Sequence, residues 1–284
     1  MKPMLAATLG AAGAVAAIYA AAAQRETTVT RTLRFGGSGE RILDIRAITG
    51  SIQVSGYDGT DVQVEVRKAV DGDSDEARRL AEQDVTLDIS DGAPRVALVV
   101  RQLTWPSCGE PDTGRSGWPR RRYRVRFDFI VRVPQNTRLE LCTINGGDIT
   151  VTDTTGDFDL RNVNGRVSMT GIRGSGSATT VNGPLTATFL ESPRTSSSFR
   201  TINGDVDLTF PASLAAEFSM ETMHGDLLTD FDVELLARPV ATPERRDGRY
   251  VYRSNGSRVR VGRGGPDIRL ETLNGDVRIR RAAR

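Results

Sequence analysis

The sequence predicts an all-β fold built from short repeats, either a β-solenoid or a superhelix of stacked β-hairpins, with one short helix in the N-terminal part. A ten-residue phrase, apolar-x-Thr-apolar-Asn-Gly-Asp-apolar-x-apolar, recurs along the second half of the chain. Apolar and polar residues alternate on both sides of each Asn-Gly pair, as in strands that bury one face, and Asn-Gly favours tight turns. Because one such unit cannot bury its apolar face alone, we expect the units to stack.

The first residues have the features of an export signal. Met1-Lys2 provides a positive start, Met4–Ala23 is almost entirely apolar, and the small residues Ala21-Ala22-Ala23 precede Gln24. This pattern predicts a cleaved signal peptide over residues 1–23, with an uncleaved N-terminal anchor as the alternative. We therefore expect an exported protein that is periplasmic, at the cell surface or extracellular.

Residues 24–136 form a β-rich N-terminal part in this prediction. Ser74 is a suitable N-cap for the only convincing helix, which runs to about Gln83. An Asp91-Gly92 turn joins two alternating runs into a predicted hairpin. The strands expected here are Thr27–Phe35, Asp61–Val70, Val85–Ile89, Arg95–Arg101 and Tyr123–Val133.

Residues 137–284 contain the repeats and are expected to continue the same domain. Phe199–Leu208 and Leu270–Ile279 are the clearest copies, and Ile45–Val54 is an early, diverged one. A glycine is added after the Asn145-Gly146 pair. The apolar residue that follows the threonine is predicted to form one buried column, made of Ile144, Val163, Val181, Ile202, Met223 and Leu273.

With these repeats and the leader, the chain resembles the bacterial β-strand repeat proteins of the domain-of-unknown-function 4097 (DUF4097) type, a family of putative adhesins. The resemblance covers most of the chain after residue 23 and is strongest from about Thr137 to Arg281. It implies an exported, all-β, repeat-built protein without catalytic residues. Because that family's name is itself drawn from architecture, it says little about function.

The composition excludes several classes of function. The 38 basic and 36 acidic residues give a net charge of +2, which argues against a nucleic-acid partner. The only histidine is His224, and it takes the place of an asparagine in one repeat. We interpret it as a diverged turn residue, because no second catalytic group accompanies it. No catalytic residue, metal ligand or cofactor is predicted.

The two cysteines are Cys108, in a loop rich in proline and glycine, and Cys142, in a predicted strand. In an oxidising compartment such a pair favours a disulfide, with two free thiols as the alternative. Closing a loop of this length stabilises a fold by roughly 3–4 kcal/mol in the chain-entropy model.

Two charged patterns are candidates for binding. In a strand, Arg120, Arg122, Arg124 and Arg126 share one face and could attract an anionic polymer, although a solvated strand face is the simpler explanation. Stacked turns would also align Asp148, Asp205, Asp226 and Asp276. Such an edge could bind Ca²⁺ or supply glycosidase-like carboxylates, but a structural role at the turns is favoured.

These observations predict an exported, non-enzymatic protein of the cell envelope that acts as an adhesin or a binding scaffold. A carbohydrate-active β-helix enzyme is the first alternative, and an envelope-stress accessory protein that binds a membrane partner is the second. An anionic polysaccharide or another envelope protein would be the partner.

Overall fold

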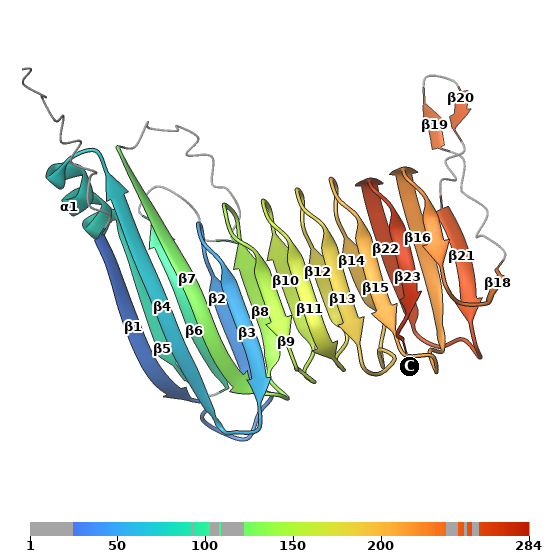
Figure 1. The fold of residues 1–284 in the computed structure, drawn as a ribbon, viewed down its shortest axis with the longest axis horizontal. Coiled ribbons are helices and arrows are strands. Elements are labelled where there is room, and N and C mark those ends of the chain that lie inside the picture. Colours follow the sequence, from blue (N-terminus) through green and yellow to red (C-terminus); the bar gives the residue numbers. More distant parts are fainter. Residues whose placement is uncertain are drawn as a thin grey trace, which may run out of the picture.

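The computed structural model describes residues 25–92, 94–102, 108, 122–236, 244–246, 249–251 and 256–283 (Figure 1). The predicted leader, residues 1–23, lies outside these. Within the described ranges no helix has the length and apolar character needed to cross a membrane. The chain forms two large sheets, which we call sheet A and sheet B, and a separate pair of short strands, β19 (Glu244–Arg246) and β20 (Arg249–Val251).

Each repeat in the middle of the molecule contributes one strand to each sheet. The chain alternates between sheet B and sheet A, and neighbouring strands within each sheet are parallel and in register. Sheet B contains β8 (Arg138–Thr143), β10 (Phe158–Asn162), β12 (Gly176–Thr179) and β14 (Ser197–Arg200). Sheet A contains β9 (Ile149–Thr152), β11 (Val167–Ile172), β13 (Leu185–Phe189) and β15 (Val206–Phe210).

The N-terminal part extends both sheets. The diverged early copy supplies β2 (Ile42–Arg46) and β3 (Ile52–Tyr57), which pair in parallel with β8 and β9. Beyond them, sheet A continues through β7 (Tyr123–Pro134), β4 (Asp61–Gly72) and β1 (Arg25–Arg34), and sheet B through β6 (Arg95–Gln102) and β5 (Val85–Asp91). The helix α1 (Asp75–Asp84) begins where predicted, with the Ser74 hydroxyl accepting a hydrogen bond from the Ala77 amide.

At the other end, the order of the repeats in space departs from their order in the chain. The last copy, β22 (Asp267–Asn274) and β23 (Val277–Arg281), lies between β14/β15 and the preceding copy, β16 (Ala216–His224) and β17 (Leu227–Thr229). Two antiparallel strands, β21 (Gly256–Val261) and β18 (Val233–Leu235), complete sheet B (Figure 1).

The core fills the space between the two sheets. Inward side chains alternate with outward ones along almost every strand, and the inward ones are nearly all apolar. A run of rings in contact continues through the repeats, with centroids 4.9–6.1 Å apart, made of Phe158, Phe199, Phe189, Phe210 and Phe218. The prediction of an all-β chain with one helix is confirmed for the described residues.

Candidate functional site

The threonine of the repeat phrase points into the protein. Its hydroxyl donates a hydrogen bond to the carbonyl oxygen of the turn glycine in the neighbouring repeat, over 2.8–3.0 Å. A buried hydroxyl needs a partner of this kind, and the bond ties successive turns together. The residues are Thr143, Thr180, Thr201, Thr222 and Thr272, and Asn162 makes the equivalent bond through its amide.

The predicted buried column is wrong, because its residues lie at the surface. Met223 is 54% exposed and Leu273 is 39% exposed. The other four members, Ile144, Val163, Val181 and Ile202, are half-buried. Successive side chains of an extended segment point to opposite sides, so when the threonine points inward the residue after it points outward. We call these six residues the apolar column.

Beside the apolar column, the asparagines form a continuous ladder of amide hydrogen bonds. Each side-chain NH₂ donates to the side-chain carbonyl of the next asparagine over 2.7–3.0 Å, in the order Asn274, Asn203, Asn182, Asn164 and Asn145. His224 ends the ladder, with Nδ1 3.1 Å from the Asn274 oxygen. Since that oxygen only accepts, Nδ1 is the donor. His224 therefore substitutes for an asparagine, consistent with its interpretation as a turn residue.

The aspartates of the turns bond to backbone amides of the neighbouring repeat. Asp148, Asp205 and Asp276 each accept from a backbone N–H over 2.8–3.0 Å. The bond from the Asp276 amide, together with Arg278, holds the pKa of Asp205 below its usual range. Their role at the turns is therefore structural, but between repeats instead of within one turn. Among the described residues, no group of three or more His, Cys, Asp or Glu side chains could hold a metal ion.

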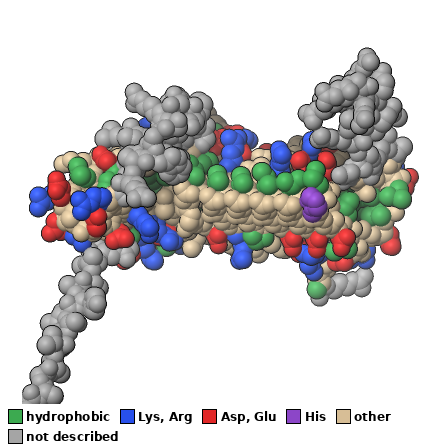
Figure 2. All heavy atoms as spheres, turned by 90° about the horizontal axis from the view of Figure 1, so that it is seen from above, with side chains coloured by type: hydrophobic (Ala, Val, Ile, Leu, Met, Phe, Trp, Pro, Cys, Tyr) green, Lys and Arg blue, Asp and Glu red, His purple; other side chains and the backbone are tan. Residues whose placement is uncertain are grey.

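Together the apolar column and the asparagine ladder form a flat surface along one side of the stack, which we call the turn edge. Figure 2 looks down on it: the apolar column is the green row, and the tan band beside it ends at the purple histidine. Neighbouring repeats are about 4.8 Å apart, as in any sheet. The turn edge is thus a regular array of apolar and amide groups carrying little charge.

Two of the four arginines in the candidate strand, Arg122 and Arg126, pair with carboxylates. Arg120 lies outside the described residues. Arg122 pairs with Asp73 at 2.8 Å, and Arg126 pairs with Asp128 at 2.7 Å, which raises the pKa of Arg126. Arg124 is exposed and faces Asp71 of β4 in register. An anion would compete with these carboxylates, so the structure adds no support for this site.

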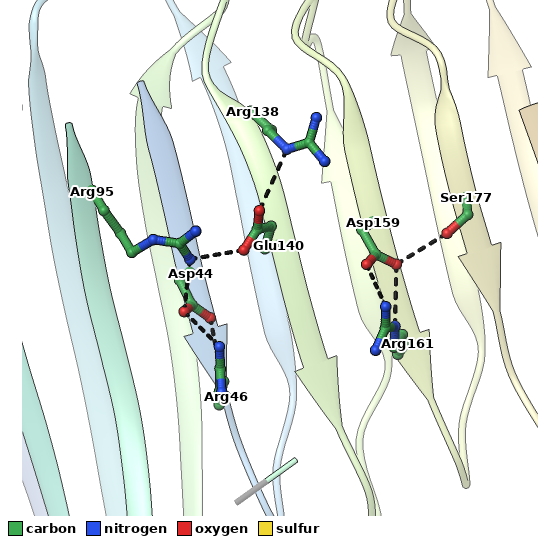
Figure 3. Close-up of polar contacts among 8 residues, drawn as sticks. All are labelled: Asp44, Arg46, Arg95, Arg138, Glu140, Asp159, Arg161 and Ser177. Atoms are coloured by element: carbon green, nitrogen blue, oxygen red, sulfur yellow. Dashed lines mark hydrogen bonds and ion pairs between the residues drawn. The ribbon is translucent and has the colours of Figure 1, made fainter. Parts of the chain in front are cut away.

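The outer face of sheet B carries a network of ion pairs (Figure 3). Arg95 bridges Asp44 and Glu140 at 2.9 and 2.7 Å. Burial would raise the pKa of Glu140, but the bonds from Arg95 and Arg138 outweigh it and lower the pKa overall. These charges compensate one another, so the face offers no strong field to a charged ligand.

Cys142, on that same face, is bonded to Cys108. Their Cα atoms are 5.7 Å apart, and the bond spans 34 residues. It fastens one point of the segment between β6 and β7 to the outer face of sheet B. A hollow of ≈ 160 Å³ beside the bond is lined by Asp44, Arg46, Arg161 and their neighbours, whose charges are paired.

Sequence reasoning missed a second hollow, at the corner where the turn edge meets sheet A. It has a volume of ≈ 350 Å³ and lies where one turn has an additional glycine. Gly147 occupies the regular glycine position, because a Cβ there would lie 2.1 Å from the Gly50 carbonyl oxygen. The inserted residue is therefore Gly146, at φ +67°, and not Gly147 as the sequence suggested; a Cβ on Gly146 would meet nothing closer than 4.0 Å. The double glycine was the available signal.

No protein-family model matches the chain, so membership of the DUF4097 type is not confirmed. No curated protein matches either. Among solved structures, a "putative cell adhesion protein" from Clostridium sporogenes is similar over 91% of this chain and 100% of its own, with 10% identity and a TM-score of 0.43. A "putative adhesin" from Bacteroides fragilis matches 90% of this chain and 97% of its own, with 11% identity and a TM-score of 0.36. A "putative lipid binding protein" from Parabacteroides distasonis matches 90% of this chain and 97% of its own, with 6% identity and a TM-score of 0.32. At these scores, function has to be argued from the chain's own residues.

Proposed function

We propose that the protein is an exported, non-enzymatic scaffold of the cell envelope, a short two-sided β-solenoid whose turn edge binds another envelope protein. The apolar column carries this proposal. Soluble surfaces usually interrupt apolar rows with charge, whereas here six adjacent repeats present an apolar side chain, beside an amide in five of them and beside His224 in the sixth. The amides are already held in place by the ladder, so binding would cost little side-chain entropy.

The lack of unpaired positive charge on the turn edge favours a protein partner over an anionic polysaccharide. Nothing in the apolar column or the asparagine ladder would attract a polyanion, and Arg122 and Arg126 pair with carboxylates. Each asparagine between the two ends of the ladder uses one N–H and one oxygen lone pair in it, which leaves a second donor and acceptor for a partner. An extended segment with apolar side chains fits such a surface.

Export is supported by the disulfide and by the predicted leader. A bond between Cys108 and Cys142 persists only in an oxidising compartment. The carbohydrate-active enzyme is the weaker alternative, because a glycosidase needs two carboxylates with separate acid and base roles at one place. The turn aspartates instead repeat one structural role at several places.

Val181→Lys tests the proposal, with Thr179→Lys as its matched control. Val181 lies on the turn edge, and Thr179, two residues earlier, lies on the outer face of sheet B. Native protein and the control should capture the same partner from a native envelope extract, and Val181→Lys should lose it. Because the contact is apolar, capture should persist as salt rises. Equal capture by all three proteins, or capture abolished by salt, would remove the turn edge from consideration.

A further inference from the structure

Over three adjacent strands, the outer face of sheet A carries no charged side chain. Its outward side chains on three adjacent strands, β9, β11 and β13, are all uncharged and hydroxylated: Thr150, Thr152, Ser168, Thr170, Thr186 and Thr188. On the outer face of sheet B, the first two of these repeats carry paired charges at β8 and β10, and the third presents Ser177 and Thr179. We call this set the hydroxyl face.

The hydroxyl face is a regular two-row array. Register pairing places Thr150, Ser168 and Thr186 in one row, and the remaining three residues in the other. The rows are roughly 6.7 Å apart and the strands about 4.8 Å apart. Threonine suits strands and pairs well across them, so an array alone could be purely structural. A second feature beside it has no such explanation.

That feature is the hollow made by the Gly146 insertion, which the fold does not need. The later turns use a single glycine and stack without a gap. Gln53 and Thr150 line the hollow and are register partners, so the first row of the hydroxyl face starts inside it. Its ≈ 350 Å³ volume falls at the small end of the range for ligand sites, about 300–1,000 Å³.

The lining of the hollow specifies the chemistry of its ligand. Apart from the two glycines it consists of polar side chains: Ser51, Gln53, Arg126, Asp148, Thr150 and Asn164. They combine amide, hydroxyl, carboxylate and guanidinium groups, which together donate and accept. A sugar hydroxyl likewise does both, and adjacent hydroxyls suit planar, bidentate groups. An apolar ligand would take water from these groups and offer no hydrogen bonds in return, which is unfavourable.

We propose that the hydroxyl face and the Gly146 hollow form a binding site for a neutral, linear polysaccharide. One sugar is held in the hollow and the chain continues along the row that begins at Thr150. A neutral polymer is favoured because Arg126 is paired with Asp128, and because Asp148 would repel an acidic sugar. The site adjoins the turn edge and shares Asn164 with it, but it lies outside the apolar column. The two surfaces would therefore let the protein bridge a glycan and an envelope protein.

Affinity electrophoresis through gels containing soluble neutral polysaccharides tests the site. Dextran, glucomannan, xylan, galactan and hydroxyethyl cellulose are the probes, with polygalacturonate as the anionic comparison. Two variants remove the site in different ways. Deleting Gly146 restores the regular Asn-Gly-Asp turn and closes the hollow, and Thr186→Lys places a charge in the first row. Thr179→Lys, in the same repeat but on sheet B, is the control.

At least one neutral polymer should retard the native protein and the control alike. The Gly146 deletion and Thr186→Lys should each weaken that binding by about tenfold or more, with melting temperatures showing that both variants fold. Should the deletion variant not fold, Thr186→Lys still decides the question. Retardation by no neutral polymer, by polygalacturonate alone, or equally for Thr186→Lys and native protein would overturn the proposal. Glycan binding is read out separately from the capture of an envelope protein, which is tested by Val181→Lys, so the two proposals can fail independently.

Discussion

Thr201→Val tests whether the buried threonines hold the stack together. Thr201 is 1% exposed, and its hydroxyl donates to the Gly183 carbonyl of the next repeat at 2.9 Å. Valine has nearly the same shape, so the substitution removes the donor without opening a cavity. The carbonyl of Gly183, a half-buried residue, then loses this donor.

Leaving an acceptor unsatisfied costs about 1–3 kcal/mol when it is fully buried and less when it is half-buried, and the added methyl group recovers part of this through burial. We therefore expect a loss of about 1–2 kcal/mol in the free energy of unfolding. For a protein of this size, the melting temperature falls by roughly 2–4 °C per kcal/mol. Urea and thermal melts followed by circular dichroism measure both quantities.

Thr209→Val is the matched control, because Thr209 is half-buried on the outer face of β15. It should leave the melting temperature within about 1 °C of the native value, since surface changes rarely exceed about 0.5 kcal/mol. Equal stability of the two variants would show that the threonine-to-glycine bonds contribute nothing, and that apolar packing alone holds the repeats.

Three further outcomes are expected. Gly204→Ala should destabilise by more than about 2 kcal/mol in urea melts, because its Cβ would lie 2.3 Å from a carbonyl oxygen of the neighbouring repeat; a native-like midpoint would contradict the stacking. The folded pKa of Glu140 is lowered, so its contribution to stability is present above about pH 4.3 and is lost below it. Glu140→Gln should therefore flatten the fall in urea midpoint below that pH, and an unchanged pH profile would refute this. Replacing Cys108 and Cys142 together by alanine should cost roughly 3–4 kcal/mol for the 34-residue loop, and an unchanged melt would count against it.

The sequence was sufficient to predict the all-β class, because the repeat phrase contains both a strand pattern and a turn signal. It was not sufficient to say which residue of the phrase is buried. Threonine and isoleucine both suit strands, and hydrophobicity favoured burying Ile202. Which residue is buried depends on the neighbouring repeat. Its Gly183 carbonyl accepts the hydrogen bond that offsets the burial of the Thr201 hydroxyl.

The candidate arginine strand illustrates a similar limit. A run of arginines is visible in the sequence, but the carboxylate that neutralises Arg122 comes from Asp73, which is distant in the chain. The hollow likewise combines Ser51 and Gln53 with Asn164, which only the stacking brings together. Turn and strand signals are local, whereas a binding surface of a stacked protein is composed across repeats.

The position of the last repeat leads to a final prediction. Because β22 and β23 lie inside the stack, removing residues 265–284 takes away an interior layer and separates β16 from β14. Deleting residues 212–264 instead leaves the end of β15 joined to β22 by Pro211, Gly265 and Pro266, which matches the three-residue connection at 173–175 between β11 and β12.

This internal deletion should melt cooperatively despite losing more residues, since each layer keeps its neighbour. The shorter truncation should leave residues 212–264 open to limited proteolysis. If the truncated protein resists protease and the internal deletion does not fold, the last repeat is an end cap in solution and the interior placement is wrong.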